Sequence, residues 1–128
     1  MRGSKKFSIL KQLKSFGFAF NGLKILIKEE HNSRIHLFAT VCVLIAAFVF
    51  EISKAEWLAV IFAIGFVFAL EIINSAIENI ADFVSPEKHV LIKKIKDLAA
   101  AGVLVSAMTA LIVGLIIFLP KIIKVLSS

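Results

Sequence analysis

Three long stretches of the chain are almost entirely apolar, and short polar segments separate them. The stretches cover residues 35–50, 57–73 and 98–119, so they are 16, 17 and 22 residues long. A helix needs about 20 residues to cross the apolar core of a bilayer. The third stretch is long enough as it stands, and the first two reach this length by adding a turn at either end. The pattern therefore predicts three membrane-spanning helices, with Ser33 as the N-cap of the first.

The segment before these stretches, residues 7–28, follows a different pattern, in which apolar side chains alternate with lysines. Its apolar side chains recur at helical spacing: Phe16, Phe20, Leu23 and Ile27. This spacing places them on one face of a helix, away from most of the lysines. Such a helix is expected to lie in the plane of the membrane surface with its lysines toward the lipid headgroups. A fourth buried span is the alternative.

Lysine and arginine are distributed unevenly around the predicted spans. Eight precede the first span, only Lys54 lies between the first two, four lie in the 74–97 connection, and two follow the last span. Cytoplasmic segments of membrane proteins carry the excess of these residues. We therefore expect the N-terminus and residues 74–97 to be cytoplasmic, and the 51–56 turn and the C-terminus to lie on the other side.

The composition supports an all-α membrane protein with a single domain over residues 1–128. Of the 128 residues, 59% are hydrophobic, whereas soluble domains are about 45–50% apolar. The single cysteine, Cys42, excludes an internal disulfide, and the three histidines lack the spacing of a zinc site. The net charge of +6 is concentrated beside the membrane and comes without a nucleic-acid-binding motif, so nucleic acid is not expected as a partner.

The second apolar stretch runs into an unexpected group of polar residues, EIINSAIENIAD, at positions 71–82. At 100° per residue, four of its side chains fall within about 80° of one another on a helix: Glu71, Asn74, Glu78 and Asp82. Charged groups near membrane depth face a protein interior or a wet cavity. Carboxylate and amide oxygens suit a hard cation, and a carboxylate at the lipid boundary suits a general base. Alternatively, these acids only cap a helix or pair with nearby lysines.

The third apolar stretch opens on Lys96 and Asp97, and Glu30 precedes the first stretch on the same predicted side of the membrane. Carboxylates that hold magnesium, a lysine that meets phosphate and a base for a hydroxyl acceptor are the parts of a phosphoryl-transfer site. The chain nevertheless lacks both G-x-x-x-x-G-K-[ST] and G-x-G-x-x-G, so the soluble nucleotide-binding folds are not indicated.

Three segments resemble the prokaryotic diacylglycerol kinase family, which includes the undecaprenol kinases. The pattern Glu-x-x-Asn-[Ser/Thr]-Ala-Ile-Glu-x-x-x-Asp is matched from Glu71 to Asp82, and Lys-Asp-x-x-[Ala/Ser]-[Ala/Gly] from Lys96 to Ala101. An upstream glutamate followed by Arg-Ile-His is matched by Glu30 and residues 34–36. The likeness extends over residues 8–119, nearly the whole chain.

The resemblance implies a homotrimeric helical bundle whose subunits each have three transmembrane helices and an N-terminal amphipathic surface helix. It implies an enzyme of the bacterial plasma membrane that transfers the γ-phosphate of MgATP to a lipid alcohol at the cytoplasmic face. The acceptor would be undecaprenol or diacylglycerol, and the product undecaprenyl phosphate or phosphatidic acid. The Arg-Ile-His element and the Ser-Pro-Glu-x-His spacing favour undecaprenol.

The resemblance also implies roles for individual residues. Glu71 would be the base, Asn74 would orient the substrate or the base, and Lys96 would meet the γ-phosphate. Glu30 and Glu78 would hold Mg²⁺. The implied nucleotide-binding residues include these two acids and six others: Lys11, Glu87, Lys88, His89, Lys96 and Asp97. Lys88 departs from the family pattern, in which an aromatic residue is common at this position.

A non-catalytic small membrane subunit or a cation-conducting bundle is the alternative from another functional class. A conduction path needs polar side chains through the whole span. Residues 57–70 carry none. The pattern therefore favours the kinase.

Overall fold

The computed structural model describes residues 8–128, and within this range it contains four α-helices and no β-strand. These helices are α1 (Ile9–Glu29), α2 (His31–Val49), α3 (Lys54–Val84) and α4 (Val90–Ser127). The last three are long and apolar enough to cross a membrane. The predicted all-α membrane fold with three spans is confirmed, and each predicted span coincides with one of these helices.

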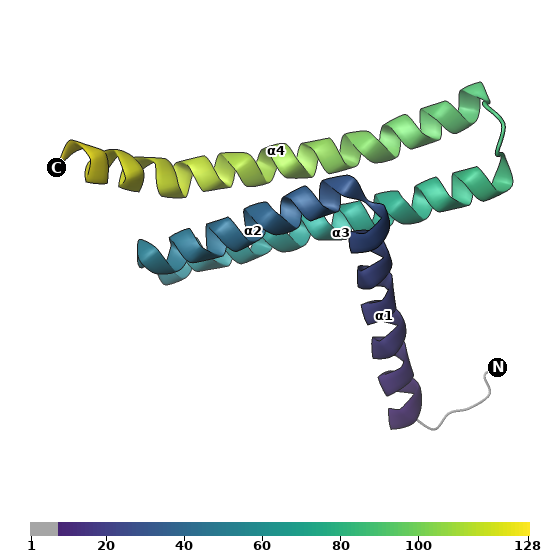
Figure 1. Cartoon of the computed structure of the whole chain (residues 1–128), viewed down its shortest axis with the longest axis horizontal. Coiled ribbons are helices and arrows are strands. Elements are labelled where there is room, and N and C mark those ends of the chain that lie inside the picture. Colours follow the sequence, from purple (N-terminus) through teal and green to yellow (C-terminus); the bar gives the residue numbers. More distant parts are fainter. Residues whose placement is uncertain (1–7) are drawn as a thin grey trace.

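Helices α2, α3 and α4 run lengthwise beside one another, and α1 lies across them (Figure 1). The predicted surface helix corresponds to α1, although Phe7, its predicted first residue, lies outside the described part of the chain. Apolar side chains along α1, such as Phe16 and Phe20, are well exposed. A helix that lies across the spanning direction and displays apolar side chains fits the membrane surface.

Polar side chains cap three of the four helices. The Ser8 Oγ accepts a hydrogen bond from the backbone N–H of Lys11 at the start of α1. Ser53 and Glu56 form a reciprocal capping box at the start of α3, and the His89 Nδ1 accepts from the N–H of Leu91 in α4. Each cap satisfies backbone donors that have no partner within the helix.

Ser33 does not cap α2, so this expectation is wrong. The helix begins two residues earlier, at His31, and Glu30 occupies the N-cap position without a side-chain capping bond. Ser33 therefore lies inside the first turn, where its hydroxyl is turned away from the backbone and toward α3.

Close packing between α3 and α4 forms most of the interior. A buried apolar cluster fills the end of the bundle near the α2–α3 connection: Ala47, Ile52, Val60, Ile117 and Phe118. Near the middle, a Cβ added to Gly102 of α4 would lie 3.3 Å from a methyl of Leu70 in α3. Small residues let membrane helices approach closely in this way.

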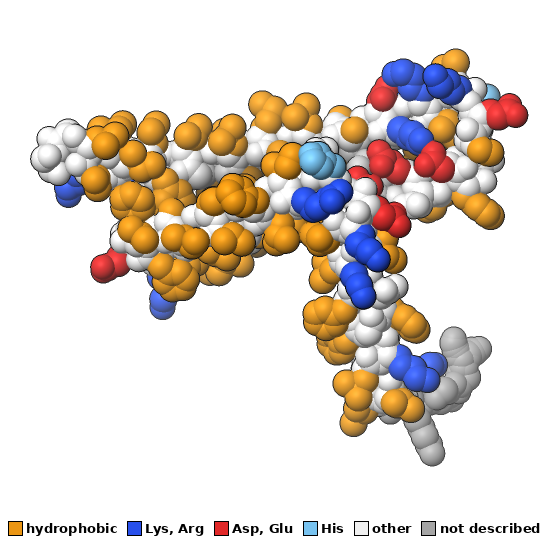
Figure 2. Space-filling model, viewed as in Figure 1, with side chains coloured by type: hydrophobic (Ala, Val, Ile, Leu, Met, Phe, Trp, Pro, Cys, Tyr) orange, Lys and Arg blue, Asp and Glu red, His pale blue; other side chains and the backbone are white. Residues whose placement is uncertain are grey.

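Charged side chains gather away from this cluster. Figure 2 shows acidic and basic groups around the α3–α4 connection and the junction of α1 with α2, whereas apolar side chains cover most of the rest of α2 to α4. Glu56 and Lys121 are an exception, because they form an ion pair of 3.1 Å between α3 and α4 at the opposite end. The polar residues from 71 onward and those that precede α2 therefore meet at one end of the bundle.

Candidate functional site

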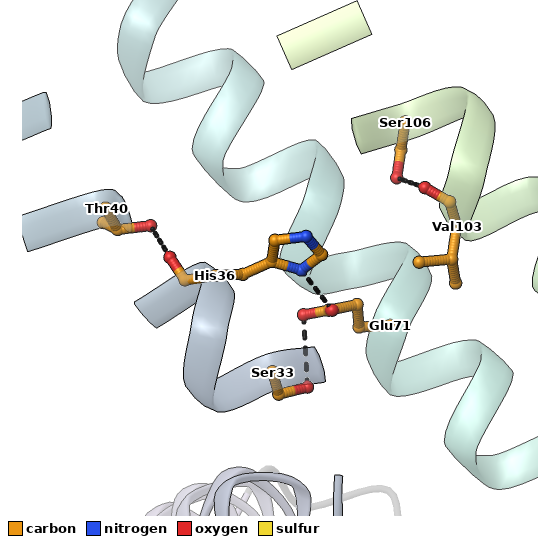
Figure 3. Close-up of polar contacts among 6 residues, drawn as sticks. All are labelled: Ser33, His36, Thr40, Glu71, Val103 and Ser106. Carbon is orange, nitrogen blue, oxygen red and sulfur yellow. Dashed lines mark hydrogen bonds and ion pairs between the residues drawn. The ribbon is translucent and has the colours of Figure 1, made fainter. Parts of the chain in front are cut away.

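Glu71 lies inside the bundle with both carboxylate oxygens bound by side chains of α2 (Figure 3). Its exposed fraction is only 4%. The Ser33 hydroxyl donates to Oε1 over 3.2 Å, and the His36 Nδ1 is hydrogen-bonded to Oε2. Glu71, the predicted general base, is thus a buried carboxylate. The expectation that the polar stripe of residues 71–82 faces the protein interior holds at this residue.

Asn74 follows Glu71 by almost one turn of α3 and is half-buried. Its Oδ1 is buried and has no hydrogen-bond partner within residues 8–128. Buried polar atoms in native proteins are nearly always hydrogen-bonded. The Asn74 Oδ1, close along α3 to the buried Glu71, is therefore a suitable acceptor for a hydrogen bond that a bound ligand donates.

The two predicted metal ligands, Glu30 and Glu78, are brought together although 48 positions separate them in the sequence. Ser75 of α3 donates its hydroxyl to the Glu30 Oε2 over 3.5 Å. Glu78 lies one turn beyond Ser75, and its charge interacts with those of Glu30, Lys96 and Asp82. The bend between α1 and α2 therefore places one carboxylate beside the other.

No group of three or more His, Cys, Asp or Glu side chains in the described range is arranged around a common metal position. The protein would thus supply two carboxylates. Magnesium is commonly held by one or two carboxylates, with water and substrate phosphates completing its ligands. Glu30 and Glu78 fit this mode of binding.

Lys96 extends from α4 to the acidic face of α3. Its Nζ lies 2.5 Å from the Asp82 Oδ1, and its charge also interacts with that of Glu78. Asp97, the next residue, pairs instead with Lys93 over 2.7 Å. The two side chains of the Lys-Asp motif thus have different partners, and only Lys96 bridges α4 to α3.

A hollow of about 520 Å³ lies where α3 and α4 are joined. Its lining contains five of the predicted nucleotide-binding residues: Glu87, Lys88, His89, Lys96 and Asp97. Ser85 and Pro86 complete the connection at its base. Both signs of charge and an imidazole therefore surround a space that opens next to the Lys96–Asp82 pair.

Lys11 is not brought to this hollow within the chain. It is exposed near the start of α1, and α1 extends away from the α3–α4 connection (Figure 1). Its predicted contact with a nucleotide stays a prediction.

An apolar groove of about 390 Å³ lies among α2, α3 and α4. His36 and Thr40 are the polar residues in its lining, and apolar side chains as far along as Phe118 form the remainder. Because His36 also bonds to Glu71, the polar end of the groove adjoins the buried carboxylate.

Ser33, His36 and Ser75 are functional candidates that the sequence pattern did not assign. Each forms a hydrogen bond to a carboxylate of the predicted site, and this carboxylate lies at least 35 positions away in the sequence. The resemblance included His36 in the Arg-Ile-His element and Ser75 in the Glu71–Asp82 pattern without giving either a role. A helical wheel could not add the contacts, because it does not show which helices meet.

Comparisons with known proteins identify the family of this chain. Residues 17–118 match the family described as prokaryotic diacylglycerol kinase. The undecaprenol kinase of Bacillus subtilis is 42% identical over 108 residues, which cover 84% of this chain and 88% of that protein. The diacylglycerol kinase of Synechocystis is 33% identical over 115 residues, covering 89% of this chain and 66% of that protein. The diacylglycerol kinase of Escherichia coli K12 is 28% identical over 100 residues, covering 78% and 82%. Because the family model matches residues 17–118 and a named relative is 42% identical, the chain belongs to the prokaryotic diacylglycerol kinase family and is a lipid kinase.

Proposed function

We propose that this lipid kinase transfers the γ-phosphate of MgATP to the hydroxyl of a polyisoprenoid alcohol, undecaprenol, at the cytoplasmic face of the bacterial plasma membrane. The observation that carries the proposal is the position of Glu71. This buried carboxylate lies between an apolar groove and the side chains that we propose to bind phosphate and Mg²⁺. It therefore stands where an oily acceptor and a water-borne donor can meet.

The acceptor would enter through the lipid-facing side. Its hydrocarbon chain would lie in the apolar groove, and its hydroxyl would reach the polar end at His36. Glu71 would accept the hydroxyl proton as the alcohol oxygen attacks the γ-phosphorus. The Oδ1 of Asn74, which lacks a partner in the described range, would accept a hydrogen bond from a bound substrate and so help to orient it.

The donor would occupy the polar end of α3 and α4. The adenosine part of ATP would lie in the hollow lined by residues 85–89, and the phosphates would point toward Lys96. The Lys96 ammonium would turn from Asp82 to the γ-phosphate, where it offsets charge that develops during transfer. The bond between the bridging oxygen and the γ-phosphorus breaks, and ADP leaves with that oxygen.

Glu30 and Glu78 are the residues that would hold Mg²⁺, because Glu30 is bound to Ser75, one turn of α3 before Glu78, and the charges of the two acids interact. When bound, the ion would supply positive charge that offsets the negative charge of the phosphates. The carboxylates would also keep the phosphate end of ATP one to two turns of α3 away from the lipid end at Glu71.

The relatives named above favour undecaprenol as the acceptor. The B. subtilis undecaprenol kinase is 42% identical to this chain, whereas the two diacylglycerol kinases are 33% and 28% identical. Purified protein incubated with radiolabelled ATP and each alcohol separately would decide between them. Undecaprenyl phosphate is the expected product, and turnover of diacylglycerol alone would contradict this choice of acceptor.

We further propose that the kinase works as a homotrimer with the N-terminus in the cytoplasm. The excess of lysine and arginine before the first span and in residues 74–97 supports the orientation. The course of α1, the helix that contains Lys11, supports an oligomer, because α1 extends away from the α3–α4 connection of its own chain (Figure 1). A neighbouring subunit would bring another hollow to this helix. Cross-linking in membranes and accessibility of cysteines introduced at residues 87 and 54 would test assembly and orientation.

A further inference from the structure

Two side chains of α2 hold the carboxylate of Glu71 from both sides. Ser33 Oγ donates to Oε1 over 3.2 Å, and His36 Nδ1 bonds to Oε2. Ser33 is 1% exposed, and the side chain of Glu71 is 4% exposed. An ionised carboxylate only accepts hydrogen bonds, so the proton of each bond comes from α2. Figure 3 shows the imidazole and the hydroxyl approaching the carboxylate from one helix.

His36 also belongs to the wall of the apolar groove. One ring thus contacts both the buried carboxylate and the space proposed for the lipid chain. The side chain of His36 is 27% exposed, which leaves part of the ring accessible beyond its bond to Glu71. A carboxylate held by two donors has a fixed plane, whereas an unheld one rotates about its last torsion angle.

We propose that His36 and Ser33 are positioning residues for the phosphoryl transfer, which hold the Glu71 carboxylate toward the polar end of the groove. This inference rests on the proposed function of Glu71 as the base. His36 keeps the proton on Nδ1, and that proton stays in the bond to Oε2. The second lone pair of the carboxylate oxygen remains available to the alcohol hydroxyl.

The competing explanation is that both side chains only join α2 to α3. A structural role predicts that variants lose folded protein and that those molecules that fold keep their turnover. A positioning role predicts a fall in kcat at unchanged KM for ATP, because ATP contacts other residues. Each variant loses a hydrogen bond to a charged group, so we expect kcat to fall in both. His36→Ala should lower kcat by at least about tenfold, and Ser33→Ala should lower it by less.

Asparagine provides the rescue variant. Its side-chain amide places an N–H donor close to the position of Nδ1, so His36→Asn should recover much of the kcat that His36→Ala loses. Thr109→Val is the control, because Thr109 lies on α4 and is not among the residues that line the groove. Its hydroxyl donates to the backbone oxygen of Val105 over 2.8 Å. We expect Thr109→Val to retain the kcat of the parent protein.

A measurement without turnover tests the contact itself. In detergent micelles, the ¹⁵N resonance of His36 Nδ1 should shift when Glu71 is changed to Gln, and it should remain in place when Glu56 is changed to Gln. An unshifted resonance in Glu71→Gln would overturn the proposal, as would equal kcat values for His36→Ala and the parent. If the parent phosphorylates no undecaprenol although the resonance shifts, the proposed function fails and the pairing of His36 with Glu71 stands.

Discussion

Lys96 of α4 is bound to Asp82 of α3, with 2.5 Å between Nζ and Oδ1. The side chains of the pair are 37% and 64% exposed, so water reaches both groups. Exposed ion pairs contribute little to stability because solvent and salt screen them. The pair therefore places the ammonium next to Glu78 and the hollow and leaves it free to exchange Asp82 for a phosphate.

Replacing Lys96 by Gln is expected to lower kcat by about 100-fold, because a donor aimed at developing charge is worth this much in comparable sites. The protein should unfold at nearly the same temperature as the parent. Lys121→Gln is the matched control, since Lys121 forms the same kind of pair with Glu56 between the same helices at the other end. Steady-state phosphorylation and thermal unfolding in micelles provide both values. Similar kcat values for the two variants would remove Lys96 from its proposed role.

Glu71→Gln is expected to reduce turnover by about 10²–10⁴-fold, the usual contribution of a general base. The amide keeps the volume of the buried side chain, so the proposed trimer should remain assembled and the KM for ATP should change little. Single-turnover transfer to undecaprenol measures the chemical step. Glu56→Gln serves as the control, because this carboxylate belongs to the same helix and lies far from the groove's polar end. Turnover that survives in Glu71→Gln would exclude Glu71 as the base.

Magnesium titrations should separate Glu30 and Glu78 from other acids of the chain. Removing one of the two proposed carboxylates should raise the Mg²⁺ concentration for half-maximal activity by about tenfold or more, since the protein supplies so few ligands. We expect this for Glu30→Gln and Glu78→Gln at fixed ATP. Glu29→Gln is the control, because Glu29 precedes Glu30 directly and is exposed at the end of α1. An equal response of all three variants would indicate a general charge effect.

The class of fold could be predicted because it depends on local patterns. Apolar runs of 16 to 22 residues indicated the spans. Helices α3 and α4 contain the second and third runs, and α2 contains the first run except for Phe50. The helices are longer than the runs because helical structure continues past the apolar residues. In α3 it continues through the polar stripe to Val84, and α4 passes through Pro120 to Ser127. Proline removes one backbone bond, and a membrane helix tolerates that loss.

The candidate site could be predicted only in part. The 100° periodicity placed Glu71 and Glu78 on one stripe, and the structure buries Glu71 and brings Glu78 near Glu30. The contacts of Ser33 and His36 with Glu71 depend on how α2 crosses α3. Because Ser33 and His36 each lie at least 35 positions from Glu71 in the sequence, no local spacing encodes their contacts with it. Ser33 was predicted to be an N-cap because its local sequence resembles the start of a helix, and its contact with α3 could not be seen in that sequence.

Lys11 allows a test of whether sites are shared between subunits. It is exposed on the part of α1 that extends away from the α3–α4 connection, whereas Lys96 faces the hollow of its own chain. If Lys11 contacts the nucleotide, the geometry favours a contact with ATP bound to another subunit. Lys11→Glu should then weaken ATP binding through charge repulsion, and Lys14→Glu, one turn further along α1, should weaken it less.

Mixing inactive chains then distinguishes the two arrangements. In trimers assembled randomly from equal amounts of Lys11→Glu and Lys96→Gln chains, about a quarter of shared sites carry both native lysines. At an ATP concentration well below the KM of the Lys11→Glu protein, we therefore expect the mixture to recover about a quarter of the parent activity, whereas each variant assembled alone shows little activity. If both lysines act within one chain, no site carries the native pair, and the mixture stays as inactive as its components. That result would place Lys11 in the site of its own subunit.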